Sequence, residues 1–171
     1  DLIGRVFEAE EPNPKWVSDI TYIPVGDNYA YLAVVMDLFS RKIVSWSLRA
    51  TMTTELILGA VRKAQENRRP TTPLIFHSDR GSQYTSEIFR RALAENGMKS
   101  SMGHTGDCFD NAVAESFFST LKKERVNRET YATLQQARRR IDSFIKFYNQ
   151  RRRHSTLGQM CPDAYEERNL T

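Results

Sequence analysis

Three segments near the start of the chain constrain its fold most, because each has the composition of a β-strand and short connections join them. Residues 16–25 and 42–50 are rich in β-branched and aromatic side chains, and residues 29–36 form a nearly continuous apolar run. A Gly-Asp-Asn turn at residues 26–28 separates the first two segments. Such short connections join neighbouring strands of opposite direction, so we expect an antiparallel meander.

Later segments alternate between helical and strand patterns. Helices are predicted where apolar residues recur with a helical period, and strands where a short apolar run lies between turn residues. The predicted elements are a helix at 54–68, a strand at 74–77, a helix at 86–96, a strand at 98–102, and helices at 111–126 and 133–150. Residues 103–110 contain two glycines and two aspartates, which is typical of a mobile loop, and the tail from Arg151 is basic and then irregular.

Length and composition indicate one globular domain. The 171 residues contain no apolar run as long as a membrane span and no signal-peptide pattern at the start. We therefore expect a cytoplasmic protein with no membrane partner. The two cysteines belong to no paired motif, so neither a disulfide framework nor a zinc module is expected. We divide the chain into a polar lead-in (1–15), a core (16–130), and a C-terminal helix and basic tail packed on the same domain (131–171).

Positive charge is clustered along the chain. The net charge is +4, and Lys and Arg recur in pairs and triplets at residues 62–63, 68–69, 90–91, 122–123, 138–140 and 151–153. Clusters of this kind indicate a polyanionic partner. The alternative for each pair alone is a solvated helix face.

An aspartate interrupts the first predicted strand. Side chains of a strand alternate between two faces, so Asp19 shares a face with Val17, Thr21 and Ile23. Strand propensity and burial both disfavour a carboxylate there, which indicates that Asp19 has a partner or binds a metal ion. The alternative is a charge that protects an edge strand from aggregation.

A second aspartate, Asp79, stands where another strand ends. It follows the apolar run at 74–77 and precedes Gly81, which can turn the chain. A carboxylate in this position is held by a rigid scaffold and still reaches solvent, as site residues of sheet proteins commonly do. An aspartate that only caps the turn fits the same residues equally well.

A third acid, Glu115, shares the polar face of a predicted helix with Lys122, seven residues later. In isolation such residues would be an ordinary surface pair. Between Asp79 and Glu115 lie 35 residues, a spacing suggestive of polynucleotidyl transferases. The same number of residues separates Asp19 from Glu55, where an acid merely suits the helix dipole, so the spacing alone decides nothing.

Four stretches of sequence resemble the retroviral-integrase-like catalytic domain of bacterial insertion-sequence transposases. They read WVSDITYI at 16–23, HSDRGSQYTS at 77–86, DNAVAESFF at 110–118 with LKKE at 121–124, and YN at 148–149 with Arg152, HS at 154–155 and LG at 157–158. The resemblance runs from about Trp16 to Tyr165. Four segments in the right order are a far more specific signal than three acids.

The resemblance implies an α/β fold and a set of site residues. The fold would be ribonuclease-H-like, a mixed five-stranded sheet flanked by helices, and the predicted order of elements agrees with it. The acidic triad falls on Asp19, Asp79 and Glu115, as catalytic residues and as ligands of two Mg²⁺ or Mn²⁺ ions, with Asp19 bridging them. The expected DNA contacts are Lys122, Lys123, Arg80 and Asn111, with helix capping as the alternative role of Asn111.

The three histidines are not predicted to bind metal. His77 reads as a structural residue at a strand end, and the sequence offers no physical account of His154. His104 has no convincing zinc partners, and His104-Thr105 stands where relatives commonly carry a basic pair before Gly106. A phosphate contact by that loop is therefore not expected.

By resemblance, the activity would be that of a DNA transposase or integrase catalytic domain, which cuts DNA at element ends and joins the 3′-hydroxyl to another phosphodiester. The implied partners are DNA, as element ends and target, and further copies of the chain in the active complex, with the protein at the nucleoid when DNA is bound. Two alternatives stay open. One is a ribonuclease-H-type or other metal nuclease, and the other is a non-catalytic nucleic-acid-binding assembly module whose carboxylates are relics.

Overall fold

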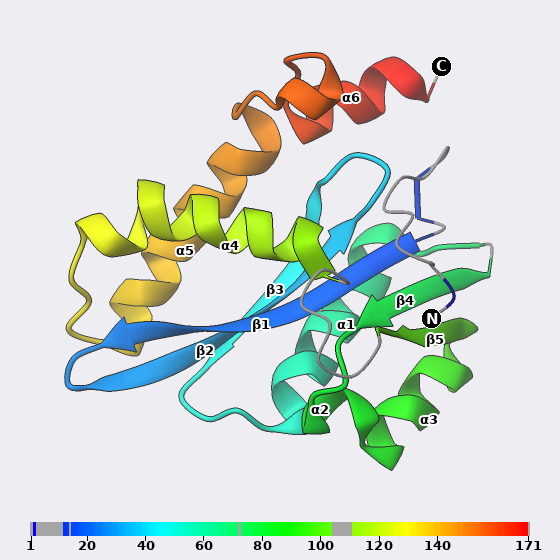
Figure 1. The fold of residues 1–171 in the computed structure, drawn as a ribbon, viewed down its shortest axis with the longest axis horizontal. Coiled ribbons are helices and arrows are strands. Elements are labelled where there is room, and N and C mark those ends of the chain that lie inside the picture. The colour runs from blue at the N-terminus through cyan, green and yellow to red at the C-terminus, as the bar shows by residue number, and fades with distance from the viewer. Residues whose placement is uncertain (1, 3–11, 14, 72, 104–110, 171) are drawn as a thin grey trace.

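A five-stranded mixed sheet organises the protein (Figure 1). The computed structural model describes residues 2, 12–13, 15–71, 73–103 and 111–170. The strand order is β3-β2-β1-β4-β5, for strands β1 (Lys15–Val25), β2 (Asn28–Asp37), β3 (Ile43–Arg49), β4 (Leu74–Ser78) and β5 (Met98–Met102). Strands β1, β2 and β3 pair antiparallel, whereas β4 is parallel to both β1 and β5. The predicted antiparallel meander and the mixed five-stranded sheet are confirmed.

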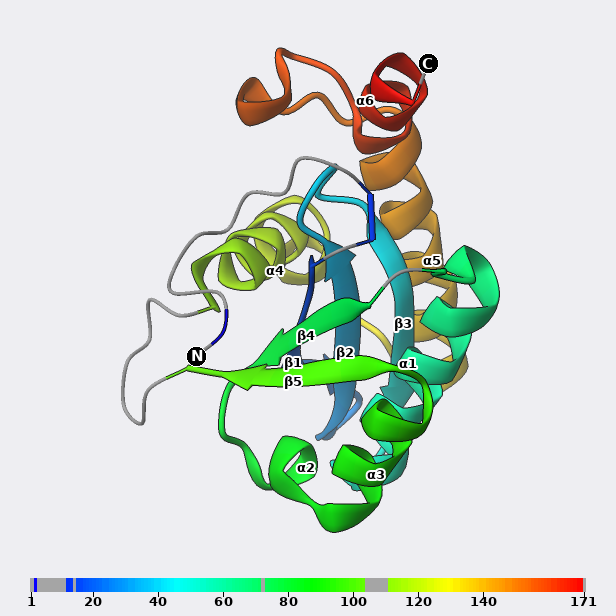
Figure 2. The ribbon, with the colours of Figure 1, turned by 90° about the vertical axis from the view of Figure 1, so that its right-hand side faces the viewer.

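Helices cover both faces of the sheet (Figure 2). One layer contains α1 (Thr54–Arg68), α2 (Ser82–Thr85) and α3 (Glu87–Glu95), and the other contains α4 (Ala112–Glu124) and α5 (Leu134–Gln150). Helix α6 (Pro162–Asn169) and the 3-10 turns at Val126–Arg128 and Ser155–Leu157 complete the described elements. No helix within the described ranges is long and apolar enough to cross a membrane.

Each face of the sheet has its own hydrophobic core, and alternation along β1 supplies both. Val17 and Ile23 pack in the core beneath α4 and α5, while Trp16 packs in the core beneath α1 and α3. Strand β2 contributes alternate residues to the two cores, which explains its nearly continuous apolar run. The result is a rigid central pair of strands, and Asp19 lies in one of them.

The side chain of Asn149 extends the sheet at its β3 edge. Its Nδ2 donates to the carbonyl oxygen of Ile43 at 3.0 Å, and its Oδ1 accepts from the Ile43 amide at 2.9 Å. The amide group thus imitates one residue of a neighbouring strand, beside the register shift between Val35 and Met36. These two hydrogen bonds fasten α5 to β3.

The tail differs from its prediction. Instead of being irregular beyond Arg151, it forms a 3-10 turn and then α6. Gly158 and Pro162 suggest chain breaks, but Pro162 is in the first turn of α6, where a missing amide hydrogen costs no helical hydrogen bond. Gly158 ends the 3-10 turn with a φ of 63°, which glycine adopts at little cost.

Buried charges hold α6 against α1 and the β2–β3 connection. Arg68 Nη1 donates to Glu166 Oε2 at 3.0 Å, and Arg68 Nη2 donates to Glu166 Oε1 and, at 3.2 Å, to Asp37 Oδ2. Ser40 Oγ donates to Glu166 Oε1 at 2.6 Å. Asp37 and Ser40 are fully buried, and Glu166 is nearly so. We call Asp37, Arg68 and Glu166 the buried ion network. The division of the chain at residues 130 and 131 stays a prediction, and α4 and α5 share one core across it.

Candidate active site

The register of the two parallel central strands aligns Asp19 with Asp79. Strand β4 pairs with β1 at Lys15–Val17, where Val17 lies opposite His77. Asp19 follows Val17 by two residues, and Asp79 follows His77 by two residues. Asp79 lies just beyond the end of β4. Ligands of open α/β sheets bind beyond the carboxyl ends of parallel strands, which is where Asp79 lies, whereas Asp19 lies within β1.

The central position of β1 excludes the alternative interpretation of Asp19 as a protective charge on an edge strand. Strand β1 lies between β2 and β4, in the middle of the sheet. Beyond Val17, however, β4 no longer pairs with β1 within the described residues, so that side of β1 becomes an open edge. Asp19 is thus held in a rigid strand but borders a gap in the sheet.

The other two predicted acids act electrostatically on Asp19. The pKa of Asp19 is raised from 3.8 to about 7, chiefly because burial removes its carboxyl from water. The hydrogen bond that Asp19 Oδ1 accepts from the Ile20 amide at 2.9 Å opposes this shift. The charges of Asp79 and Glu115 raise the pKa further. An acid within β1, an acid that follows β4 and an acid on α4 therefore lie near one another.

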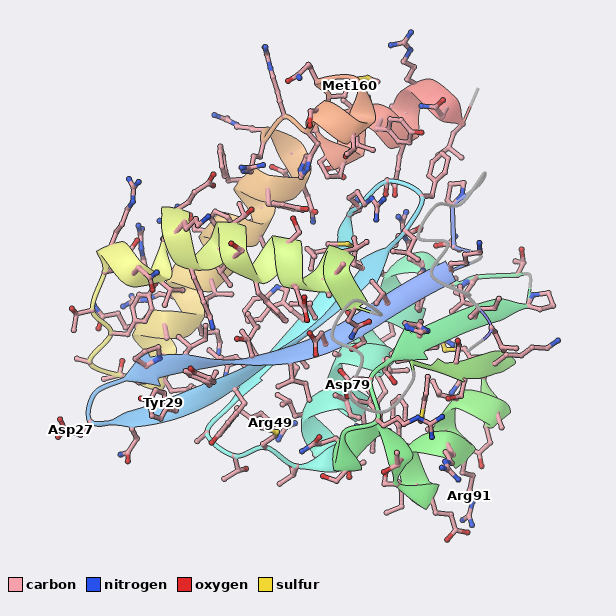
Figure 3. The ribbon with its side chains drawn as sticks, in the orientation of Figure 1. Asp27, Tyr29, Arg49, Asp79, Arg91 and Met160 are labelled. Carbon is pink, nitrogen blue, oxygen red and sulfur yellow. The ribbon has the colours of Figure 1, made fainter. Side chains whose placement is uncertain are left out.

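Asp79 caps the turn after β4 and its side chain still reaches solvent. Its exposed side chain lies near the centre of the molecule in Figure 3, and its Oδ1 accepts from the Gly81 amide at 2.7 Å, which caps the turn. A Cβ atom on Gly81 would lie 3.0 Å from Asp79 Oδ1 and 3.1 Å from Gln83 Oε1, so glycine keeps this turn tight. The adjacent Arg80 donates from Nε to the Gly103 carbonyl at 2.9 Å and links the ends of β4 and β5.

Helix α4 presents Glu115 because its opposite side is apolar. Ala114, Phe117 and Leu121 are buried against the sheet, which leaves Glu115 exposed in the first turn. Lys122 lies two turns further on, with its Nζ 4.7 Å from the ring centroid of Tyr22. The neighbouring Lys123 is exposed.

Asn111 anchors the start of α4 to β1. It occupies the N-cap position, as one of the predicted alternatives had it, but its side chain makes no capping hydrogen bond. Instead, Asn111 Nδ2 donates to the carbonyl oxygen of Ser18 at 3.1 Å, and the residue is only 5% exposed. Because Ser18 directly precedes Asp19, Asn111 sets the position of α4 relative to that carboxyl. Its DNA contact stays a prediction.

Sequence reasoning missed Tyr84, the counterpart of Asn111 on the other face of the sheet. This fully buried residue of α2 shares a hydrogen bond of 2.9 Å between its hydroxyl and Ser18 Oγ. Burial, followed by the charge of Asp19, raises the pKa of Tyr84 well above its ordinary value. Ser18 is therefore held from both faces, by its carbonyl and by its hydroxyl. The sequence could have indicated Tyr84, because a tyrosine lies close to Asp79 in the chain and a buried phenol needs a polar partner.

Two of the three histidines have structural surroundings. His77 is buried and shares a hydrogen bond of 2.9 Å between Nδ1 and Ser101 Oγ of β5. The ring of His154 stands edge-on to Tyr148, with 4.7 Å between centroids. Burial, and then the positive charge of Arg152, lowers the pKa of His154 to about 4. His154 therefore packs as a neutral ring. The predicted loop residues 104–110, with His104 and Cys108, lie outside the described residues.

Some of the predicted basic clusters supply ion pairs within the chain. Arg68 belongs to the buried ion network, and Arg152 makes a two-pronged contact with Glu124, with Nη2 to Oε1 at 2.9 Å. Arg140 contacts Glu129 in the same way, with Nε to Oε2 at 2.8 Å. The side chain of Arg68 is largely buried, whereas the pairs of Arg140 and Arg152 lie at the surface.

The acidic residues suit a hard divalent cation in chemistry. Carboxylate oxygens are the ligands that Mg²⁺ and Mn²⁺ prefer, and Asp19, Asp79 and Glu115 supply them without a thiolate or imidazole. Within the described ranges, no three or more His, Cys, Asp and Glu side chains are close enough together to hold one metal ion. The three carboxyl groups are thus electrostatic neighbours rather than a closed ligand shell, and their catalytic and metal-binding roles stay predictions.

Comparison with known sequences identifies relatives of the whole chain. A model of the integrase core domain matches residues 9–108, and another integrase core domain model matches residues 96–162. The transposase for insertion sequence element IS904 of Lactococcus lactis is 41% identical over 170 residues, which are 99% of this chain and 67% of that relative. Transposase InsF for insertion sequence IS3A of Escherichia coli is 38% identical over 171 residues, 99% of this chain and 59% of the relative.

Solved structures share the fold at low sequence identity. The HTLV-2 integrase catalytic core domain in complex with magnesium aligns with a TM-score of 0.66 and 18% identity, covering 91% of this chain and 97% of its own. A chain of the simian T-cell lymphotropic virus intasome aligns with a TM-score of 0.76 and 16% identity, covering 93% of this chain and 56% of its own. These likenesses confirm the expected ribonuclease-H-like fold. The chain belongs to the integrase core domain family, and transposases of bacterial insertion sequences are among its relatives.

Proposed function

We propose that this chain is the catalytic core of an insertion-sequence transposase, which cleaves DNA and joins a 3′-hydroxyl end to another phosphodiester. The observation that carries the proposal is the register of β1 and β4, which places Val17 opposite His77, two residues before Asp19 and Asp79, while the charge of Glu115 on α4 contributes to the raised pKa of Asp19. Family membership supports the reaction class. The chain spans 67% and 59% of two transposase relatives, so the activity of the whole protein belongs to the proposal as well.

Asp19, Asp79 and Glu115 would hold two Mg²⁺ or Mn²⁺ ions, with Asp19 between them. When bound, such ions neutralise charge on the phosphate oxygens and favour deprotonation of the attacking water or hydroxyl. The pKa of Asp19, raised chiefly by burial and then by its acidic neighbours, supports this assignment. A half-buried carboxyl with like charges around it gains most from a cation.

The surrounding residues would orient the carboxyl groups and the DNA. Asn111 and Tyr84 fix Ser18 and hence the backbone next to Asp19, so we assign them positioning roles. Lys122 and Lys123 on α4, with Arg80 beyond β4, would contact phosphates of the DNA. Since the HTLV-2 catalytic core is described in dimeric and trimeric forms, we propose that several copies of this chain assemble on DNA.

The decisive experiment is an Mn²⁺-dependent cleavage and joining assay on labelled DNA duplexes that include 3′-hydroxyl ends. We expect Glu115→Gln to lower both products by about 10³-fold, which corresponds to about 4 kcal/mol of lost transition-state stabilisation. The matched control is Glu124→Gln on the same helix, which loses only the surface ion pair with Arg152 and should keep its activity.

Each alternative has its own outcome in this assay. Hydrolysis of phosphodiesters without any joining of 3′-hydroxyl ends would indicate a ribonuclease-H-type or other nuclease. DNA binding with neither product, in wild type as in Glu115→Gln, would indicate a non-catalytic assembly module. Equal activity of wild type and Glu115→Gln would refute the assignment of Glu115.

A further inference from the structure

Two tyrosines on the β1–β2 hairpin form an exposed aromatic pair. Tyr22 and Tyr29 are each 55% exposed, and their rings stand edge to face with 5.1 Å between centroids and 80° between planes. Figure 3 shows Tyr29 near the tip of this hairpin, and Figure 1 shows the C-terminal half of α4 passing over the same hairpin. Packing within the protein leaves more than half of each ring open to solvent.

Tyr22 and the lysine beside it lie on elements that carry site acids, β1 and α4. Tyr22 follows Asp19 by three residues on β1, which is about 10 Å along a strand. Lys122, seven residues after Glu115 on α4, places its Nζ 4.7 Å from the Tyr22 ring centroid. The aromatic pair and its cation are therefore held at a fixed separation from the proposed catalytic carboxyl groups.

The aromatic pair borders the open edge of β1. By strand alternation, Asp19 lies on the face of the sheet that α4 covers, and Tyr22 points to the opposite face. Lys122 nevertheless reaches Tyr22 from α4, past the part of β1 that β4 leaves unpaired in the described residues. A DNA strand that leaves the carboxyl groups along this edge would pass both the ammonium group and the rings.

We propose that Tyr22 and Tyr29 bind an unpaired nucleobase of the DNA substrate by stacking, and that Lys122 moves from the Tyr22 ring to a phosphate as the base takes its place. The proposal rests on the proposed function. A base must be unpaired and unstacked to offer its face, and aromatic side chains accept any base because every base has a π-face. An exposed cation–π contact is weak, whereas an ammonium–phosphate contact is charge-assisted, so the exchange is favourable.

The structural alternative is that the two tyrosine rings only stabilise the β1–β2 hairpin. Tyr22 lies directly opposite Tyr31, and cross-strand aromatic pairs do stabilise antiparallel strands. That role predicts that Tyr22→Ala lowers stability and leaves the preference for unpaired DNA unchanged. The stacking role predicts a change in DNA preference for variants that remain folded.

The test measures DNA binding without divalent metal. The probes are a blunt duplex and the same duplex with a three-nucleotide single-stranded 3′ end that carries 2-aminopurine, whose fluorescence falls on stacking. We expect wild type to bind the single-stranded end more tightly and to quench its fluorescence. Tyr22→Ala should weaken that binding by about 5- to 150-fold, while Tyr22→Phe should retain it.

Two further variants separate loss of folding and loss of any exposed ring from loss of the stacking site. Tyr22→Val retains a β-branched residue in the strand and replaces Tyr22→Ala if the latter unfolds. Phe147→Ala removes another exposed aromatic ring, 42% exposed on α5, and should bind both probes like wild type. Equal preference and equal quenching by wild type, Tyr22→Val and Tyr29→Ala would overturn the proposal.

Failure here and failure of the proposed function are distinguishable. The binding assay contains no divalent metal and measures no cleavage, so its readout does not depend on catalysis. Quenching that depends on Tyr22 in a protein without strand-transfer activity would support the stacking site alone. Strand transfer by a protein that shows no quenching would support the catalytic assignment and refute the stacking site.

Discussion

The two groups of partly buried acids in this protein differ in whether a cation lies among them. In the buried ion network, the guanidinium of Arg68 lies between Asp37 and Glu166. Around Asp19, the groups that shift its pKa include Asp79 and Glu115 but no cation. The same residue types thus build a balanced cluster at one end of the sheet and an unbalanced cluster beside β1.

The pKa directions express this difference. The pKa of Glu166 is lowered, because Arg68 and Ser40 outweigh the effect of burial. Within the same network the pKa of Asp37 is raised, since its complete burial outweighs two backbone hydrogen bonds and Arg68. For Asp19, burial and repulsion act together, and the pKa reaches about 7. In the first cluster each buried carboxyl group depends on the cation it contacts, whereas the cluster around Asp19 is a place where an external cation would be stabilising.

The largest expected effect on stability comes from removing the cation of the buried ion network. Arg68→Met would leave Asp37 and Glu166 buried without their partner, and we expect the free energy of unfolding to fall by about 3–5 kcal/mol. Arg62→Met on the same helix is the matched control, because Arg62 and its partner Glu55 are exposed and 3.7 Å apart. The control should change stability by less than about 1 kcal/mol in urea denaturation. Similar losses in both variants would erase the contrast between buried and exposed pairs.

The unbalanced cluster should respond to pH in a definite direction. Since the pKa of Asp19 is about 7 in the folded protein and ordinarily 3.8, the folded state binds an extra proton between these values. The free energy of unfolding therefore falls as pH rises from about 4 to 7, by as much as about 4 kcal/mol from this group. Asp19→Asn should remove this loss, so without metal it should be more stable than wild type at pH 8 but not at pH 4.

The pKa of Glu166 is shifted in the opposite direction, so its effect on stability should depend on pH in the opposite way. Its lowered pKa means that its contribution to stability is present above its ordinary value of 4.5 and is lost as pH falls through the folded-state pKa. Glu166→Gln should therefore lose stability relative to wild type at neutral pH, and the difference should shrink in acid. Urea denaturation of both variants at several pH values measures these trends. The same pH trend for Asp19→Asn and Glu166→Gln would contradict the comparison.

Local sequence patterns sufficed for most of the fold. Alternation along residues 16–25 and the apolar run at 29–36 predicted β1 and β2, because burial of one or both faces fixes those patterns. Helix α6 was missed because Pro162 resembles a chain break when its position in the first turn is unknown. Helix α2 was missed because four residues make little more than one helical turn, which is too short for apolar residues to recur with a helical period.

Long-range partners explain what the sequence could not predict near the site. Asn111 was predicted at the start of a helix, but its side chain bonds to Ser18, 93 positions away in the chain. Tyr84 bonds to the same residue across 66 positions. Arg68 seemed to be part of a surface basic pair, since nothing local indicates Glu166 at a separation of 98. Periodicity identifies a buried face, but it does not identify the polar group that the fold brings to that face.

Addition of Mg²⁺ should change the unbalanced cluster selectively. At a concentration ten times the dissociation constant, a ligand that binds only the folded state stabilises it by about 1.4 kcal/mol. We expect this gain for wild type and for Arg68→Met, which retains the three site acids, and a much smaller gain for Asp19→Asn. Thermal unfolding with and without Mg²⁺ at pH 8 measures it. An equal gain in Asp19→Asn would show that the ion binds elsewhere.

The smallest expected effect concerns Lys122 on α4, the helix that also carries Glu115. In the described structure Lys122 lies over the Tyr22 ring instead of pairing with an acid. If it contacts a DNA phosphate, Lys122→Ala should weaken binding to DNA of any sequence and make the slope of log K against log salt shallower by about 1. The matched control is Lys63→Ala, since Lys63 also lies over an aromatic ring, 5.8 Å from the Trp46 centroid, but on α1. Its salt slope should equal that of wild type. An unchanged slope for Lys122→Ala would mean that Lys122 only packs on Tyr22, and the unbalanced cluster would then have to draw its DNA contacts from other residues.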